Sequence, residues 1–93
     1  MEITKETRLV GGMGTKYLSG TSNNTGLTHS TIEANEDCTF TSITGNDING
    51  NVVDLLTIFN MSGVTLKEGK MLYCSLNYTI TAVQLASGTI FVH

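Results

Sequence analysis

The sequence contains no proline and no tryptophan, and only five of its 93 residues are basic. A chain without proline lacks one of the residues that commonly block the edge strands of a sheet, so we expect exposed edges that pair with a neighbour. The basic residues are scattered, and the net charge is −3. Because nucleic-acid binding requires a basic surface that neutralises phosphates, we expect no nucleic-acid partner.

The sequence also lacks a long apolar run. The longest, Val52 to Phe59, contains Asp54 and is far too short to span a bilayer, so we expect no membrane partner. No apolar segment typical of a signal peptide is visible, which predicts synthesis in a cytoplasm. Cys38 and Cys74 are then expected to stay reduced and to pack as small hydrophobic side chains, with a disulfide between them as the alternative.

The residues that are abundant, Thr, Ser, Asn and Gly, favour strands and turns over helices. The last third, Met71 to His93, alternates apolar and polar residues with the period of a half-buried strand. The alternation changes phase at Ala82-Val83, which predicts a bulge or a strand break. Ser87-Gly88 is a turn signal, and Thr89 to His93 is predicted as the returning strand of a hairpin.

Further short strands and turns are predicted before this region. The predicted strands are Lys16 to Ser19, Thr28 to Ala34, Asp37 to Thr44 and Val64 to Leu66, and the predicted turns or loops are Asn35 to Asp37, Gly45 to Asn51 and Lys67 to Lys70. This spacing predicts an all-β fold, a small antiparallel sandwich or barrel of about six to eight short strands. We assign residues 1–10 to an N-terminal arm and residues 11–93 to a single β domain.

One segment is ambiguous between helix and strand. Val52, Leu55, Leu56 and Phe59 have helical spacing, with Asn51 as a plausible cap, yet many residues of this segment are strand formers. We predict that Val52 to Phe59 is a strand buried on both faces.

The sequence shows no recognisable metal-binding or catalytic motif. Asp47, Asn49, Asn51 and Asp54 suggest calcium, but the sixth place of such a loop, which requires glycine, is Val52, so a polar turn is expected instead. His29 is expected to be solvated, and the acids show no spacing that singles out a general acid and base. We therefore predict no enzyme activity, no catalytic residues, no cofactor and no metal.

The candidate residues for the core and for assembly are instead apolar. They lie on the apolar side of the predicted strands and are Phe40, Ile80, Val83, Leu85, Ile90 and Val92.

Three strings in the sequence resemble a family. They are Asn35-Glu-Asp-Cys-Thr-Phe-Thr-Ser-Ile-Thr-Gly-Asn46, Ser62-Gly-Val-Thr-Leu-Lys-Glu-Gly69 and Leu85-Ala-Ser-Gly-Thr-Ile-Phe-Val92. They resemble a loose group of small β-rich proteins encoded among the virion genes of tailed bacteriophages, in which an acidic turn precedes a Thr/Phe strand and a "GVTL" turn precedes the last strands. The sequence departs from that group at Lys67-Glu68, where a proline is usual, and at the terminal His93.

The resemblance implies a structural protein of the virion, most often a capsid auxiliary or decoration protein that binds and stabilises the head. It implies the major capsid protein or other virion proteins as partners, a homo-oligomer with a trimer favoured, and location in the virion after synthesis in the host bacterial cytoplasm. A fibre or tail-tip module that contacts the host surface is the alternative. A small host-takeover protein acting in the cytoplasm is a third hypothesis.

Overall fold

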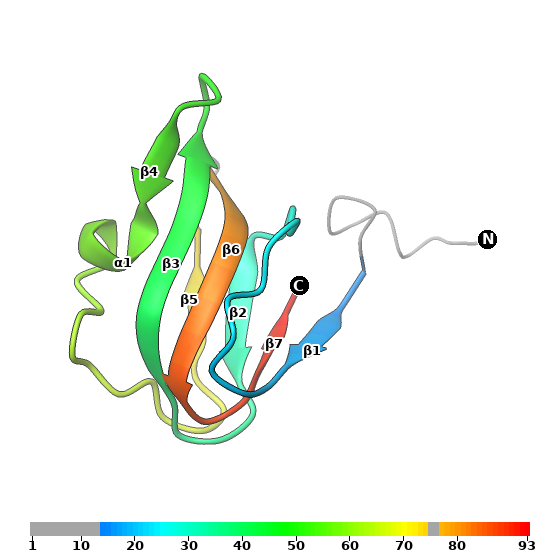
Figure 1. The fold of residues 1–93 in the computed structure, drawn as a ribbon, viewed down its shortest axis with the longest axis vertical. Helices are drawn as coiled ribbons and strands as arrows, with labels where there is room; N and C mark the ends of the chain where they lie inside the picture. Colours follow the sequence, from blue (N-terminus) through cyan, green and yellow to red (C-terminus); the bar gives the residue numbers. More distant parts are fainter. Residues whose placement is uncertain (1–13, 75–76) are drawn as a thin grey trace.

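The computed structural model of the chain describes residues 14–74 and 77–93. Seven strands and one short helix follow one another in this part of the chain (Figure 1). In order they are β1 (Lys16–Leu18), β2 (Thr31–Ala34), β3 (Thr39–Asp47), β4 (Val52–Asp54), α1 (Leu55–Ile58), β5 (Met71–Tyr73), β6 (Tyr78–Ser87) and β7 (Ile90–Val92). Strand accounts for 50% of the structure and helix for 5%, which confirms the predicted all-β fold.

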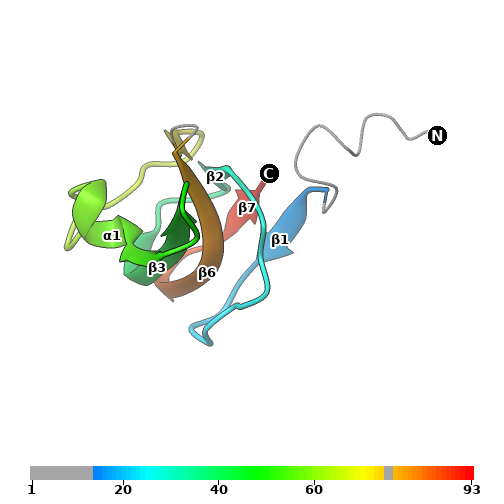
Figure 2. The same ribbon diagram turned by 90° about the horizontal axis from the view of Figure 1, so that it is seen from above.

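The strands form two antiparallel sheets whose inner sides enclose the core. Sheet A has the order β1-β7-β2-β5, and sheet B has the order β4-β3-β6. Figure 2 shows β3 and the curved β6 of sheet B beside β2 and β7 of sheet A, with β1 lying farther from sheet B. The predicted N-terminal arm, residues 1–10, lies outside the described residues, as do residues 11–13 of the predicted β domain.

The predicted hairpin at Ser87-Gly88 is wrong. β6 pairs with β3 in sheet B, whereas β7 lies between β1 and β2 in sheet A, so this turn carries the chain from one sheet to the other. Gly88 has a φ of +83°, and a Cβ added to it would lie 2.5 Å from the Cβ of Cys38. The turn therefore packs directly against the start of β3, and only glycine fits there without strain.

The predicted change of phase in the last third is confirmed as an irregularity of β6. Thr44 pairs with Ala82 and Gly45 pairs with Ile80, so Thr81 is an extra residue without a place in the register, although its hydroxyl donates to the carbonyl of Thr44 at 3.3 Å. Both Ile80 and Val83 are consequently buried although they are three residues apart. A bulge of this kind restores the apolar side chains to the core after the phase has slipped.

The predicted buried strand from Val52 to Phe59 is also wrong. Only Val52–Asp54 is strand, and Leu55–Ile58 forms α1. Asp54, not Asn51, caps the helix: its Oδ1 accepts from the backbone N–H of Thr57 at 3.4 Å, and its Oδ2 accepts from the Thr57 hydroxyl at 2.8 Å. The helix buries Leu55, whereas Val52 remains 76% exposed.

The remaining strands and turns differ from the prediction mainly at their ends. β3 continues to Asp47, so the predicted loop from Gly45 shrinks to the tight turn between β3 and β4. The predicted strand Val64 to Leu66 is absent from the described residues, since only Leu66 forms a bridge, with Cys38. The turn from Lys67 to Lys70 is confirmed by a 3.0 Å hydrogen bond from the N–H of Lys70 to the carbonyl of Lys67.

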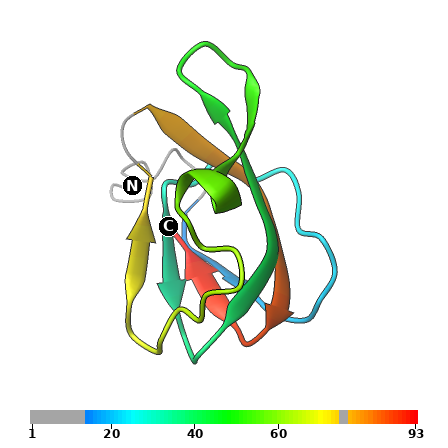
Figure 3. The ribbon, with the colours of Figure 1, turned by 90° about the vertical axis from the view of Figure 1, so that its left-hand side faces the viewer.

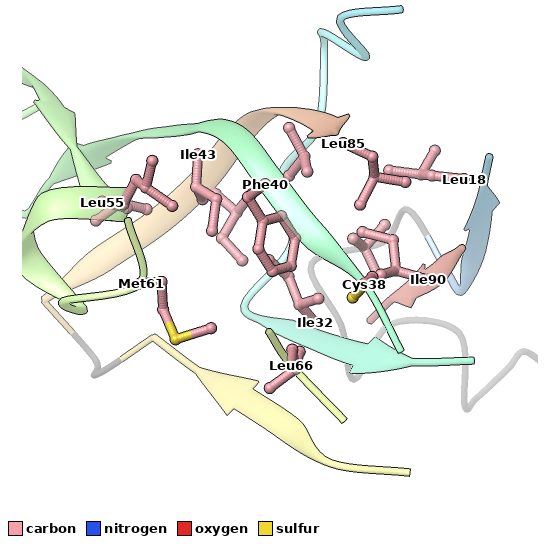
Figure 4. Packing of buried hydrophobic residues seen from close by; sticks show 14 of the residues in the cluster. Leu18, Ile32, Cys38, Phe40, Ile43, Leu55, Met61, Leu66, Leu85 and Ile90 are labelled. Atoms are coloured by element: carbon pink, nitrogen blue, oxygen red, sulfur yellow. The ribbon is translucent and has the colours of Figure 1, made fainter. Parts of the chain in front are cut away.

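The core lies between the two sheets and continues under α1. Figure 4 shows Phe40 of β3 in its centre, between Leu55 on the helix side and Ile90 on the side of sheet A. Gly45 brings β3 close to its neighbours: an added Cβ would collide with the carbonyl oxygen of Thr79 and lie 2.5 Å from Cδ1 of Leu55. Close approach at this glycine allows the helix to close one end of the core.

Candidate interaction surface

The six residues predicted for the core and for assembly all lie inside the protein. Their exposed fractions run from 0% to 6%, and they are Phe40 of β3, Ile80, Val83 and Leu85 of β6, and Ile90 and Val92 of β7. Because they are enclosed by both sheets, they can support folding but cannot contact a partner directly. A role in assembly has to be carried by other residues.

Residues 14–74 and 77–93 contain no pocket and no group of three or more His, Cys, Asp or Glu side chains that could share a metal ion. Three of the residues that suggest a calcium loop instead form the β3–β4 turn. Oδ1 of Asp47 accepts from the N–H groups of Asn49 and Asn51, each at 2.9 Å. The same described residues include no helix long and apolar enough to cross a membrane.

The expectation that His29 is solvated is wrong, since it is only 1% exposed. Its Nε2 lies 2.8 Å from the carbonyl oxygen of Gly14, and its Nδ1 accepts from the N–H of Thr28 at 3.2 Å. Both ring nitrogens are therefore satisfied in one neutral tautomer, with Nε2 protonated. His29 therefore has a structural role: its ring contacts Gly14 at the start of the described chain, and its backbone pairs with Ile80 of β6.

The two cysteines are free thiols, Cys38 buried and Cys74 partly buried. Desolvation raises the pKa of each thiol to about 11, with the nearby carboxylates of Asp37 and Glu36 adding to the effect at Cys38. Both thiols are thus protonated at neutral pH, and a protonated thiol is a poor nucleophile and a poor metal ligand.

The most unusual surface is the outer side of sheet A. The strand registers place Tyr17, Phe91, Glu33 and Met71 in one row across β1, β7, β2 and β5. A second row continues from His93 through Thr31 to Tyr73. We call the side chains of Tyr17, Glu33, Met71, Tyr73, Phe91 and His93 the aromatic face. Three of them are large and well exposed: Tyr17 is 52%, Met71 41% and Tyr73 66% exposed.

The rings of the aromatic face hold one another in place. The centroids of Tyr17 and Phe91 are 5.3 Å apart at an interplanar angle of 54°, and those of Phe91 and His93 are 6.5 Å apart at 28°. Nε2 of His93 lies 2.8 Å from Oε1 of Glu33, and its Nδ1 lies 2.9 Å from Oγ1 of Thr15. These contacts reduce the rotamer freedom that the rings would otherwise lose on binding a partner.

The outer side of sheet B has a different composition. Its side chains alternate with the buried Ile43 and with Gly45, and they are Ser42, Thr44, Asn46, Ala82 and Gln84. We call this set the threonine face. These residues of β3 and β6 include neither a ring nor a charge, whereas β4 adds Asp54 beside Thr44 and the exposed Val52 beside Asn46. Gln84 donates to the carbonyl oxygen of Thr21 at 3.0 Å, so the segment before β2 already covers part of this side.

The apolar parity of the last strand, which marks its buried side, does not reveal the aromatic face. Ile90 and Val92 point into the core, and Phe91 and His93 occupy the opposite parity. A phenylalanine on the solvent parity of a strand was the available signal. Its neighbours Tyr17 and Met71 could not be found by spacing, since they come from the two ends of sheet A.

Comparison of the chain with protein-family models, with curated proteins and with solved structures finds no match.

Proposed function

We propose that this chain is a structural protein of a bacteriophage virion, a capsid auxiliary or decoration protein that binds the head and stabilises it. The observation that supports this proposal most strongly is the aromatic face. Tyrosine, phenylalanine and methionine are enriched at protein interfaces, and here they share one exposed side of a sheet. The turn and strand motifs that resemble small virion proteins give the biological setting.

In this proposal the aromatic face contacts the major capsid protein or another virion protein. Tyr17 and Phe91 supply the central apolar contact, and Tyr73 extends it towards the edge strand β5. Aromatic anchors of this kind carry most of the energy in well-packed interfaces. The chain acts by binding and performs no catalysis, and it functions as a homo-oligomer on the particle.

A fibre or tail-tip module that contacts the host surface is the second candidate. The exposure of Tyr73 favours it, since a free tyrosine ring can stack on a sugar. Phe91, however, packs against two rings, with centroid distances of 5.3 Å to Tyr17 and 6.5 Å to His93. A ring that packs against two others has less of its surface free to stack on a sugar, which favours the first candidate.

The test is made on purified virions of the phage that carries this gene. We expect mass spectrometry to find the chain in the particles and antibody labelling to place it on the head. Labelling at a fibre or tail tip would favour the second candidate, and absence from the particle would refute both. A Phe91→Ser variant with unchanged circular dichroism should be missing from heads, whereas the matched variant Thr44→Ser on the threonine face should be incorporated normally.

A further inference from the structure

Each sheet ends in two edge strands, and one of these four edges is already covered. β6 is bordered by the segment that precedes β2: the backbone of Asn24 exchanges hydrogen bonds with Val83 in both directions, and that of His29 does so with Ile80. Within residues 14–74 and 77–93, the edge strands that remain uncovered are β1, β4 and β5.

Charge distinguishes these three strands. Proteins protect an edge strand from pairing with another chain by placing a charged residue in it. β1 contains Lys16 and β4 contains Asp54. β5 has the sequence Met71-Leu72-Tyr73 and contains no charge, although Lys70 precedes it. β5 is therefore the least protected edge in the described part of the chain.

The backbone of β5 also presents free hydrogen-bonding groups. Cys74 donates to the carbonyl of Ser30 at 2.8 Å, Ala34 donates to the carbonyl of Lys70 at 2.9 Å, and Leu72 is paired with Ile32. Antiparallel ladders alternate, so the N–H and C=O groups of Met71 and Tyr73 point away from β2. Figure 3 shows β5 on the border of sheet A, and the described residues form no strand beyond it.

We propose that β5 pairs with β5 of a second copy of this chain, antiparallel, about a two-fold axis through Leu72. In this register Leu72 faces Leu72 of the second copy on the core side. Met71 faces Tyr73 of the second copy on the outer side, and these two residues exchange both of their hydrogen bonds, once on each side of the axis. Methionine sulfur opposite a tyrosine ring is a favourable contact, and the symmetry supplies it twice.

The short sequence of β5 is what selects a second copy as the occupant. In the antiparallel register Met71 lies opposite Tyr73 of the second copy, and Leu72 lies opposite itself. The contact is closed, because the described residues of each copy form one edge strand without a charge. Lys70 comes to lie opposite Cys74 of the second copy, so no like charges meet across the axis. The result is a dimer formed through two-fold symmetry, in contrast to the trimer expected from the resemblance.

The size of the contact sets its strength. Two three-residue strands bury much less than the roughly 800 Å² per partner that a stable interface needs. We therefore expect a weak, reversible dimer in solution. The two-fold axis of this dimer is perpendicular to the sheet, so both aromatic faces lie on the same side of the joined sheet. Two linked aromatic faces would bind a particle more tightly than one. The pairing does not depend on the proposed role in a virion, because the isolated chain would show it.

The register can be tested by cysteine cross-linking. In a Cys74→Ser background, Leu72→Cys should form a disulfide-linked dimer under mild oxidation, because residue 72 meets itself at the axis. Met71→Cys alone and Tyr73→Cys alone should remain monomeric, since each of these positions is more than about 7 Å from its own copy. An equimolar mixture of the two should cross-link. The fully buried, protonated Cys38 can stay in place.

Sedimentation of the unmodified chain provides a measurement that does not require a substitution at the partly buried Leu72. We expect the average mass to rise from 10.0 kDa towards twice that value as concentration increases. Met71→Lys with Tyr73→Lys should remain monomeric at every concentration, and Val52→Lys on the exposed edge of β4 should associate like the parent. A parent chain that stays monomeric throughout, or association that is lost only in Val52→Lys, would overturn the proposal.

Discussion

The outer sides of the two sheets both lie over a buried core, and they differ in composition. Both cover strands whose inner residues are fully buried, as Ile43 is in sheet B and Ile90 in sheet A. The threonine face covers them with small polar side chains that suit water. The aromatic face places Tyr17, Phe91 and Tyr73 at equivalent positions. Since sheet B shows that rings on the outer side are not needed for this fold, their presence on sheet A supports the proposal that this side contacts a partner.

The edges of the sheets repeat this contrast. The outer edge of sheet B at β6 is covered by residues of the same chain, and β4 carries Asp54. β5, at the border of the aromatic face, carries no charge and has free backbone groups. The aromatic face and the edge strand β5 therefore lie next to each other, and both are candidates for contact with another chain. The predictions below test whether each inner side supports folding while each outer side is free for binding.

The largest effect is expected on the inner side of β7. Ile90→Asp would place a carboxylate among apolar neighbours and remove a buried side chain worth about 1.5–3 kcal/mol. Because the total stability of so small a domain is about 5–15 kcal/mol, we expect the variant to be unfolded at room temperature by circular dichroism.

Thr89→Ala is the control for this substitution. Its hydroxyl donates to Glu36 at 2.8 Å and accepts from Asn35 at 3.0 Å, both at the surface, so its loss should cost no more than about 1 kcal/mol. A folded Ile90→Asp variant would contradict the claim that β7 is central to the core.

The sequence predicts the inner sides of both sheets well because burial imposes a period. Phe40, Leu85 and Val92 were identified from alternation alone, and the bulge at Thr81 was predicted within one or two residues. Alternation does not indicate to which sheet a strand belongs, so the sequence predicts a hairpin at Gly88 where the chain passes from one sheet to the other.

Short-range polar contacts were equally hidden. Asp54 begins α1 through two hydrogen bonds to Thr57, which overrides the preference of the surrounding residues for strand. His29 is buried because residues 14 and 28 happen to meet its two nitrogens. The aromatic face depends on register between strands that are distant in sequence, and alternation within one strand cannot supply it.

The next largest effect is expected at Gly45, on the inner side of sheet B. Gly45→Ala would drive a methyl group into the carbonyl of Thr79 and against Leu55, and overpacking of this kind costs about 1–3 kcal/mol. Urea denaturation should show a lower midpoint with an unchanged slope. The neighbouring Thr44→Ala, on the threonine face, should shift the midpoint much less; an equal shift would mean that the outer side of sheet B is itself important for stability.

A smaller effect is expected from the aromatic face. Double-mutant cycles with Tyr17→Ala and Phe91→Ala should give a coupling free energy of about 0.5–1.5 kcal/mol, the value of a well-placed aromatic pair. Ser42 and Gln84 pair across the threonine face, and the double-mutant cycle with Ser42→Ala and Gln84→Ala should give a coupling free energy of no more than about 0.3 kcal/mol. Coupling of the same size on both faces would remove the evidence that the rings form an organised surface.

The smallest effect concerns the turn that ends sheet B. Hydrogen bonds from the backbone N–H of Asn51 first, then from its side chain and from the N–H groups of Asn49 and Gly50, lower the pKa of Asp47 below its usual 3.8. A carboxyl group whose pKa is lower in the folded state stabilises that state above pH 3.8, and this contribution is lost as the pH falls through the lowered value. Asp47→Asn should therefore lower the urea midpoint slightly at neutral pH, where the carboxylate contributes, and flatten its decline below pH 3.8. The pKa of Asp37 is lowered in the same direction, chiefly by the N–H of Glu68, so Asp47→Asn should retain the part of the decline that Asp37→Asn removes. If Asp47→Asn declines in acid as steeply as the parent, the carboxylate of Asp47 does not hold the β3–β4 turn in solution.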